Sequence, residues 1–344
     1  MTTTRPDPPT ERRGGGPGRP PAEAFAAVVD SVKSVLYTDP STVVLAVGCL
    51  MAGGHLLVED LPGLGKTTLA KALARSVGLG FHRVQFTADL LPADITGAMV
   101  LDLATRQPVF RPGPVFTNVL MADELNRASP RAQSALLEAM EERQVSVDGQ
   151  TLPLPRPFLV VATQNPYDAA GTSPLPHGQR DRFLLRLSLG YPARADEDRL
   201  LAGTDPSERV DRLAAAVTPD ELASVMAAVG AVHVAPAARA YVLDLVAATR
   251  SHPSVRVGAS PRAALSVLRA ARALAVFGGR SYVNADDIQA VAVPALAHRL
   301  LLHAGDEAAG GAPGSAVQEV LDQVPAPLAG PAPRNGDQPD GAEP

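Results

Sequence analysis

The 344-residue chain contains no tryptophan and a single cysteine, and aromatic residues make up only 4% of it. One cysteine excludes a disulfide framework within the chain, so we expect a reducing cytoplasm as its location. That residue, Cys49, lies in the apolar run 43–51 and is predicted to be buried rather than reactive. Few aromatic residues and a net charge of −5 argue against a nucleic-acid partner bound by stacking or by a broad basic face.

Long hydrophobic runs are also missing. The longest, residues 43–58, is interrupted by glycines and by His55 and is too short to cross a bilayer. Residues 1–22 are rich in threonine, proline, arginine and glycine and lack the apolar stretch of a secretory signal. We therefore expect no direct membrane insertion.

Lysine occurs only at positions 33, 66 and 71, whereas arginine supplies every other basic side chain. Lys66 follows a glycine loop that links an apolar strand to a helix with apolar positions on one side. A strand, a glycine turn and a Lys-Thr pair that opens a helix form the pattern of a P-loop, in which backbone N–H groups and the helix N-terminus bind phosphate. The predicted phosphate-binding residues are Pro62, Gly63, Leu64, Gly65, Lys66, Thr67 and Thr68.

Within this loop, Lys66 is predicted to reach the outer phosphates and Thr67 to bind a magnesium ion. The general pattern GxxxxGK[ST] requires a glycine where Asp60 stands. An ordinary strand, turn and helix with a chance Gly-Lys-Thr is the alternative to this interpretation. The loop alone therefore indicates a nucleotide site without establishing it.

A pair of carboxylates follows the apolar run 119–122. Asp123 and Glu124 are expected at the carboxyl edge of a parallel sheet, where ligands bind in such folds. We predict that Asp123 holds magnesium and that Glu124 accepts a proton from the water that attacks the γ-phosphate. A solvated acidic turn is the alternative for this pair alone, but together with the P-loop it predicts a nucleotide triphosphatase.

Asn165 and Arg262 add weaker signals. Asn165 follows the apolar run 158–163 and could orient the attacking water, although Asn-Pro is also a common turn. Arg262 lies in the first turn of a predicted helix, where a cation opposes the helix dipole, which suggests that it binds an anion.

The chain is predicted to be an α/β protein with two structured parts between two tails. Residues 23–195 alternate short apolar runs with helical patterns, which favours a parallel sheet between helical layers. Residues 205–305 show helices and no strands. Residues 1–22 and 306–344 are predicted to be disordered, except for a short helix at 316–324. The predicted strands are 55–58, 82–86, 119–122, 158–163 and 183–189, with hairpins at 145–152 and, more weakly, at 99–111.

Six segments together resemble the MoxR family of AAA+ ATPases, within the group that has an insert in the second helix and a hairpin before sensor 1. The resemblance spans about residues 25–305 and includes Asp60, which broke the general P-loop pattern. The segments are LLVEDLPGLGKTTLAKALA, VQFTADLLPADITGAMVLD, GPVFTNVLMADELNRASPRAQSALLEAMEERQVSVDG, VVATQNP, PLPHGQRDRFLLRLSLGYP and GASPRAALSVLRAARALA.

The resemblance implies a role for each matching residue. Residues 63–68 would form Walker A, and Asp123 with Glu124 would form Walker B. Asn165 would be sensor 1, Arg182 the arginine finger that enters a neighbouring subunit's site, and Arg262 sensor 2 in an all-helical lid. The family implies ATP and Mg²⁺ as ligands and a homo-oligomeric ring, commonly a hexamer. It also implies chaperone-like maturation of partners, often proteins with a von Willebrand factor A domain.

Two segments depart from the family pattern. His177 replaces an acidic residue and Arg180 an apolar one next to the finger, so Arg180 is a second candidate for the finger role. Residues 37–41 replace the usual Val-Gly-Gln segment, which leaves the adenine contacts unassigned.

Three other functions stay open. A metal-chelatase motor subunit would share these inserts. A nucleotide-gated scaffold would bind ATP with negligible hydrolysis, against which the intact Glu124 and Asn165 speak. A DNA-translocating motor fits the acidic charge poorly.

Overall fold

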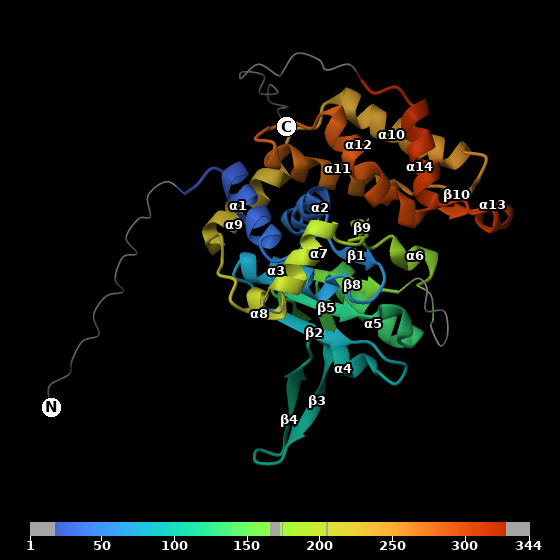
Figure 1. Ribbon diagram of the computed structural model, residues 1–344. Coiled ribbons are helices and arrows are strands. Elements are labelled where there is room, and N and C mark those ends of the chain that lie inside the picture. The colour runs from blue at the N-terminus through green and yellow to red at the C-terminus, as the bar shows by residue number, and fades with distance from the viewer. Residues whose placement is uncertain (1–17, 166–172, 174, 204–205, 328–344) are drawn as a thin grey trace, which may run out of the picture.

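The chain forms an α/β core with a helical part packed above it (Figure 1). This computed structural model describes residues 18–165, 173, 175–203 and 206–327. The outer parts of both predicted tails, residues 1–17 and 328–344, lie outside the described residues.

The core sheet has five strands in the order β2-β5-β8-β1-β9, and all four neighbouring pairs are parallel. The prediction of a parallel α/β sheet is therefore confirmed, with strand ends that differ from the predicted ones by one or two residues. The strands are β1 (Leu56–Glu59), β2 (Phe81–Gln85), β5 (Val119–Asp123), β8 (Leu159–Gln164) and β9 (Leu185–Leu187).

Alternate residues of the central strands face two separate hydrophobic clusters, as the pleat of a strand requires. Leu56 and Val58 of β1 pack in the cluster that contains Leu69 of α3 (Lys66–Ser76), whereas Leu57 packs in the cluster that contains Leu136 of α5 (Pro130–Glu142). The sheet is thus covered on both faces, which explains why β1, β5 and β8 are apolar runs without polar alternation.

The helical part contains α9 (Pro219–Ala231), α10 (Pro236–Ser251), α11 (Pro261–Phe277), α12 (Ala285–Leu296) and α14 (Pro313–Gln323). Its helices begin where capping residues predict them, because Thr218, Ser260 and Asn284 each accept a hydrogen bond from a backbone N–H of the first turn. The N-terminal helices α1 (Pro21–Lys33) and α2 (Pro40–Met51) pack against both α9 and α11. They therefore connect the core to the helical part.

The prediction that no strand follows residue 205 is wrong. Two short strands, β10 (Val255–Val257) and β11 (Leu301–Leu302), pair antiparallel within the helical part. Each is too short to show a period of two, and α11, α12 and a 3-10 helix separate them in the sequence, so no local pattern could reveal their pairing. The helix predicted at 316–324 is α14, which packs on α10 and α12.

Both predicted hairpins are present. Strands β6 (Gln144–Val147) and β7 (Gln150–Pro153) are joined by Asp148 and Gly149, which both have positive φ as a tight hairpin turn requires. The other hairpin, β3 (Gly97–Asp102) with β4 (Gln107–Pro112), projects from the core on the side away from the helical part (Figure 1).

Shorter helices complete the chain: α4 (Pro92–Thr96), η1 (Leu125–Arg127), α6 (His177–Arg180), α7 (Arg194–Ala202), α8 (Pro206–Asp211), η2 (Ala297–Arg299) and α13 (Ala304–Ala308). None of the helices in the described part of the chain combines the length and apolar character that crossing a bilayer requires.

Buried His55 makes the stability of this core dependent on pH. Its Nδ1 accepts a hydrogen bond from the backbone N–H of Val160 at 3.0 Å, and its Nε2 lies 3.1 Å from the carbonyl oxygen of Met140. Burial lowers the pKa of His55 from 6.5 to about 4. As the pH falls, the unfolded chain therefore binds the His55 proton before the folded chain does. The free energy of unfolding should decrease as the pH falls below 6.5.

We expect this loss to reach about 2 kcal/mol between pH 6.5 and pH 5. Denaturant titrations of the wild type and of His55→Gln across that range measure it. The variant should be less stable at neutral pH but less sensitive to acid, whereas His82→Gln at an exposed position should keep the wild-type slope. Equal slopes for the wild type and His55→Gln would contradict the assignment.

Candidate functional site

The predicted phosphate loop and acidic pair line one cavity of about 460 Å³ at the carboxyl edge of the sheet. Loops after β1, β5 and β8 meet there, because parallel strands end at the same edge. The lining residues are Pro62, Gly63, Gly65, Lys66, Thr67, Thr68, Arg83, Gln85, Asp123, Glu124, Thr163, Gln164 and Asn165.

The loop after β1 turns through a left-handed glycine directly into a helix. Gly65 has φ +91°, which a side chain would strain, and α3 begins directly after it at Lys66. The Lys66 ammonium donates to the carbonyl oxygen of Asp60 at 2.5 Å. Burial lowers the pKa of Lys66, although the carboxylates of the cavity act in the opposite direction. A partly buried cation on the cavity wall is suited to an anionic ligand.

Asp60, the residue that departs from the general P-loop pattern, anchors the loop instead of lining the cavity. Its Oδ2 accepts hydrogen bonds from the hydroxyl of Ser188 at 2.9 Å and from the backbone N–H groups of Leu189 and Gly190 at 2.6 and 2.9 Å. These bonds lower its pKa against the effect of burial. A glycine could not make them, so the aspartate ties the phosphate loop to the turn that follows β9.

The acidic pair is fixed by the strands on either side of it. Asp123 accepts from Arg83 of β2 at 2.6 Å and from the Thr163 hydroxyl of β8 at 2.6 Å. The backbone N–H of Glu124 donates to the same hydroxyl at 2.9 Å. Glu124 has φ +55°, uncommon for a residue with a side chain, and its carboxylate lies 3.0 Å from Arg127.

Thr67 and Asp123 fit a magnesium site. Both line the cavity, one from the start of α3 and one from the end of β5. No group of three or more histidine, cysteine or acidic side chains able to hold a metal occurs among the described residues. Magnesium does not require one, because it binds one or two carboxylates together with phosphate oxygens and water.

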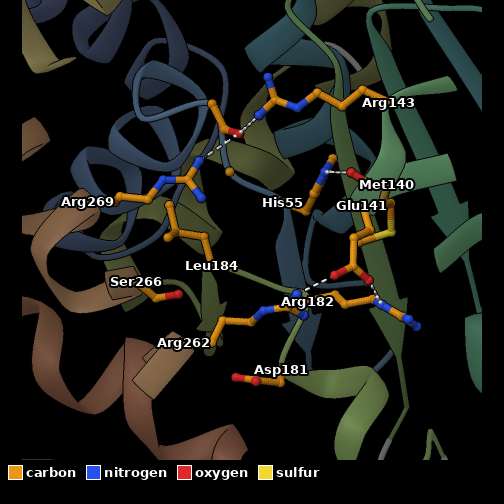
Figure 2. A pocket seen from close by; sticks show the side chains of 12 residues that line it. His55, Met140, Glu141, Arg143, Asp181, Arg182, Leu184, Arg262, Ser266 and Arg269 are labelled. Carbon is orange, nitrogen blue, oxygen red and sulfur yellow. Dashed lines mark hydrogen bonds and ion pairs between the residues drawn. The ribbon is translucent and has the colours of Figure 1, made fainter. Parts of the chain in front are cut away.

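Four predicted residues remain, and of these Asn165 lines this cavity whereas Leu64 of the phosphate loop does not. Arg182 and Arg262 line a different, smaller cavity of about 180 Å³ between α5, the loop before β9 and the start of α11 (Figure 2). There both arginines form ion pairs with Glu141. The structure thus brings the two arginines together but places neither in the phosphate cavity of its own chain.

Arg180, the second candidate for the finger, takes a different position. Its Nε donates to the carbonyl oxygen of Leu175 at 3.1 Å, so the side chain is bound to its own loop. Arg182 is bound as well, to Glu141 in the smaller cavity, so the two candidates differ in their partners.

Sequence reasoning missed Arg83, Thr163, Glu141 and Arg299. Arg299 is 2% exposed and donates to the Asp181 carboxylate at 2.7 Å and to the Phe183 carbonyl oxygen at 2.6 Å, so it holds the segment that carries Arg182. Burial lowers its pKa to about 10. Thr163 could have been noticed as a polar residue inside an apolar strand, but the other three make contacts that no local pattern contains.

These features define a P-loop nucleotide-binding protein with a helical lid: a phosphate loop after β1, an acidic pair after β5, a polar sensor position after β8, and a helical part above them. Comparison with known proteins gives the same class. Residues 55–185 match the family described as "ATPase family associated with various cellular activities (AAA)", and residues 247–322 match the "AAA lid domain".

Two curated relatives narrow the class to a family. The "Chaperone MoxR1" of Mycobacterium tuberculosis is 39% identical over 335 residues, which cover 92% of this chain and 87% of the relative. The "Protein MoxR" of Paracoccus denitrificans is 33% identical over 79% of this chain and 87% of the relative. The chain therefore belongs to the MoxR family of AAA+ ATPases, as its sequence motifs indicated.

A solved structure supports the fold along nearly the whole chain. The crystal structure of a candidate ATPase from Cytophaga hutchinsonii is 34% identical, covers 89% of this chain and 96% of its own, and superposes with a TM-score of 0.81.

Proposed function

We propose that the protein hydrolyses ATP with Mg²⁺ and uses the cycle to remodel or mature partner proteins. The observation that carries the proposal is the convergence of Lys66, Thr67, Asp123, Glu124 and Asn165 on one cavity. Family membership supports nucleotide binding, and the carboxylate next to the magnesium position adds a base for hydrolysis.

The phosphate loop and three further side chains of the cavity each have a role in the proposed reaction. The backbone N–H groups of residues 63–67 and the Lys66 ammonium would bind the phosphates. Thr67 and Asp123 would hold magnesium, which neutralises charge on the phosphate oxygens when bound. Glu124 would accept the proton of the attacking water, and Asn165 would orient that water against the γ-phosphate.

We further propose that the chains form a ring, most simply a hexamer, with ATP at the subunit interfaces. Arg182 lies outside the cavity of its own chain, and hydrolysis would be completed by Arg182 of a neighbouring subunit. Phosphate release per subunit should therefore rise as protein concentration passes through the range of assembly, measured alongside molar mass by light scattering. Constant release per subunit from monomer to ring would contradict this arrangement.

We propose that the partner is a protein with a von Willebrand factor A domain. We further propose that the two proteins meet in the cytoplasm and that no nucleic acid takes part. The β3–β4 hairpin offers a contact surface, because Leu101 and Leu103 near its tip are 63% and 85% exposed. A Glu124→Gln ring loaded with ATP should retain a von Willebrand A domain protein of the same cell, and ADP should release it. Equal retention with ADP would argue against a nucleotide-driven cycle.

Two alternatives have distinct signatures. A nucleotide-gated scaffold would bind ATP and release no phosphate. A metal-chelatase motor subunit would release phosphate and would also support metal insertion into a cofactor in the presence of a large partner subunit.

A further inference from the structure

Glu141 forms ion pairs with both arginines that the family pattern singles out. Its Oε2 lies 2.7 Å from the Nε of Arg182, and its Oε1 accepts a hydrogen bond from the guanidinium of Arg262. Figure 2 shows the carboxylate between the two guanidinium groups, one from the core and one from the lid. The hydrogen bond from Arg182, and to a smaller extent the one from Arg262, holds the pKa of Glu141 below its usual range.

The position of Glu141 is unfavourable for its own helix. It lies in the last turn of α5, where the exposed carbonyl groups repel a carboxylate. Glu142 is the next residue and shares this disadvantage, but no ion pair among the described residues involves it. Arg182 and Arg262 thus offset the unfavourable interaction of the Glu141 carboxylate with the helix C-terminus.

The segments that carry the two arginines are also joined directly. The hydroxyl of Ser260, which caps α11, donates to Asp181 at 3.1 Å, and Arg299 binds the same carboxylate from the other side. The segments that carry Arg182 and Arg262 are therefore held together through Asp181. This arrangement gives Glu141 a rigid platform on which to align the two side chains.

The cavity around Glu141 carries an excess of positive charge. Arg143, Arg182, Arg262 and Arg269 line it, against the carboxylates of Glu141 and Asp181. Arg143 and Arg269 donate to the backbone carbonyl of Gly53, at 3.0 and 3.1 Å, rather than to a carboxylate (Figure 2). Glu141 therefore lies in a cationic surface that is suited to a phosphate group.

We propose that Glu141 is a positioning residue that holds Arg182 of the core and Arg262 of the lid together, so that both reach one phosphate group of a neighbouring subunit's ATP. Two adjacent guanidinium groups repel each other, and the shared carboxylate between them offsets this repulsion. The proposal rests on the proposed function, since it requires ATP hydrolysis at a subunit interface.

Glu141→Gln tests this role, because it keeps the size of the side chain and removes its charge. We expect phosphate release by the assembled ring at saturating ATP to fall about tenfold, since displacing a catalytic group by about 1 Å can cost up to roughly 100-fold. The Kd for ATP of the unassembled protein, from titration with a fluorescent ATP analogue, should be unchanged because Glu141 lies outside the phosphate cavity of its own chain. Glu142→Gln is the matched control and should retain wild-type release.

Two further measurements separate positioning from a purely structural role. Glu141→Asp, which keeps the charge on a shorter side chain, should recover part of the lost rate. In an Arg262→Ala background, Glu141→Gln should cost less than it does in the wild type, because one of the two aligned groups is gone.

Several outcomes would overturn the proposal. Release by Glu141→Gln at or above the wild-type level would show that the carboxylate does not assist the arginines, and an equal loss in Glu142→Gln would show a general effect of charge at this helix end. If the wild-type ring releases phosphate normally and Glu141→Gln does as well, only the role of Glu141 fails. If the wild-type ring releases none, the proposed hydrolysis fails and this proposal falls with it.

Discussion

Replacing Glu124 by glutamine should leave ATP bound and stop its turnover. The amide cannot accept the proton of the attacking water, and loss of a positioned general base lowers the rate by about 100- to 10,000-fold. The backbone N–H of Glu124 holds Thr163, and the substitution leaves this contact in place, so Asp123 should keep its position. Phosphate release at saturating Mg²⁺-ATP, with the Kd for ATP measured in parallel, gives both quantities.

A matched control for this variant is Glu138→Gln on the exposed side of α5. It removes the same charge outside the cavity and should retain wild-type turnover. Undiminished turnover in Glu124→Gln would exclude Glu124 as the base and favour a different proton acceptor.

Replacing Lys66 by alanine should strongly weaken nucleotide binding itself. Lys66 lines the cavity. Its ammonium group donates a hydrogen bond to the carbonyl oxygen of Asp60, which belongs to the same loop. Hydrogen bonds that involve a charged group contribute about 1.5–3 kcal/mol each, so we expect ATP binding to weaken roughly 100-fold. The rise in Tm that ATP causes in the wild type should disappear in this variant.

Lys71→Ala provides the control within the same helix. Lys71 forms an ion pair with Asp211 at 2.7 Å on the outside of α3, away from the cavity. It should bind ATP as the wild type does. Equal weakening in both variants would show that α3 is disturbed as a whole and that Lys66 has no special role.

The parts of the molecule that could be predicted from sequence are those encoded within one segment. The phosphate loop, with Lys66 directly after Gly65, and the acidic pair after β5 each combine a strand and its following turn in fewer than twenty residues. The periodicity of such segments reports the local fold, and parallel strands necessarily bring their carboxyl ends together. For this reason one cavity could be anticipated from three separate motifs.

Contacts between distant segments could not be predicted in this way. The carboxylate of Glu141 meets Arg182 and Arg262, which lie 41 and 121 residues further along the chain. In the sequence, Asp60 departs from the general P-loop pattern and matches the family, but its structural role is visible only in its bonds to Ser188, Leu189 and Gly190. These contacts depend on how the lid and the turn after β9 pack on the core.

The proposed ring depends on the separation between the arginines and the phosphate cavity. Arg182 and Arg262 share Glu141 on a surface that is distinct from the phosphate cavity. In the proposed ring, one chain would present two halves of a site, the cavity that would bind ATP and the arginine pair that would complete the site of its neighbour.

Mixing two inactive variants tests this central claim most directly. Lys66→Ala supplies intact arginines without a functional phosphate loop, and Arg182→Ala supplies an intact loop without its finger. Each variant alone should release little phosphate, and a mixed ring should recover a substantial part of the wild-type rate, because some interfaces combine a complete loop with a complete arginine pair. Phosphate release that stays at the level of the separate variants, in mixed rings verified by light scattering and by co-purification of differently tagged chains, would contradict a site shared between subunits.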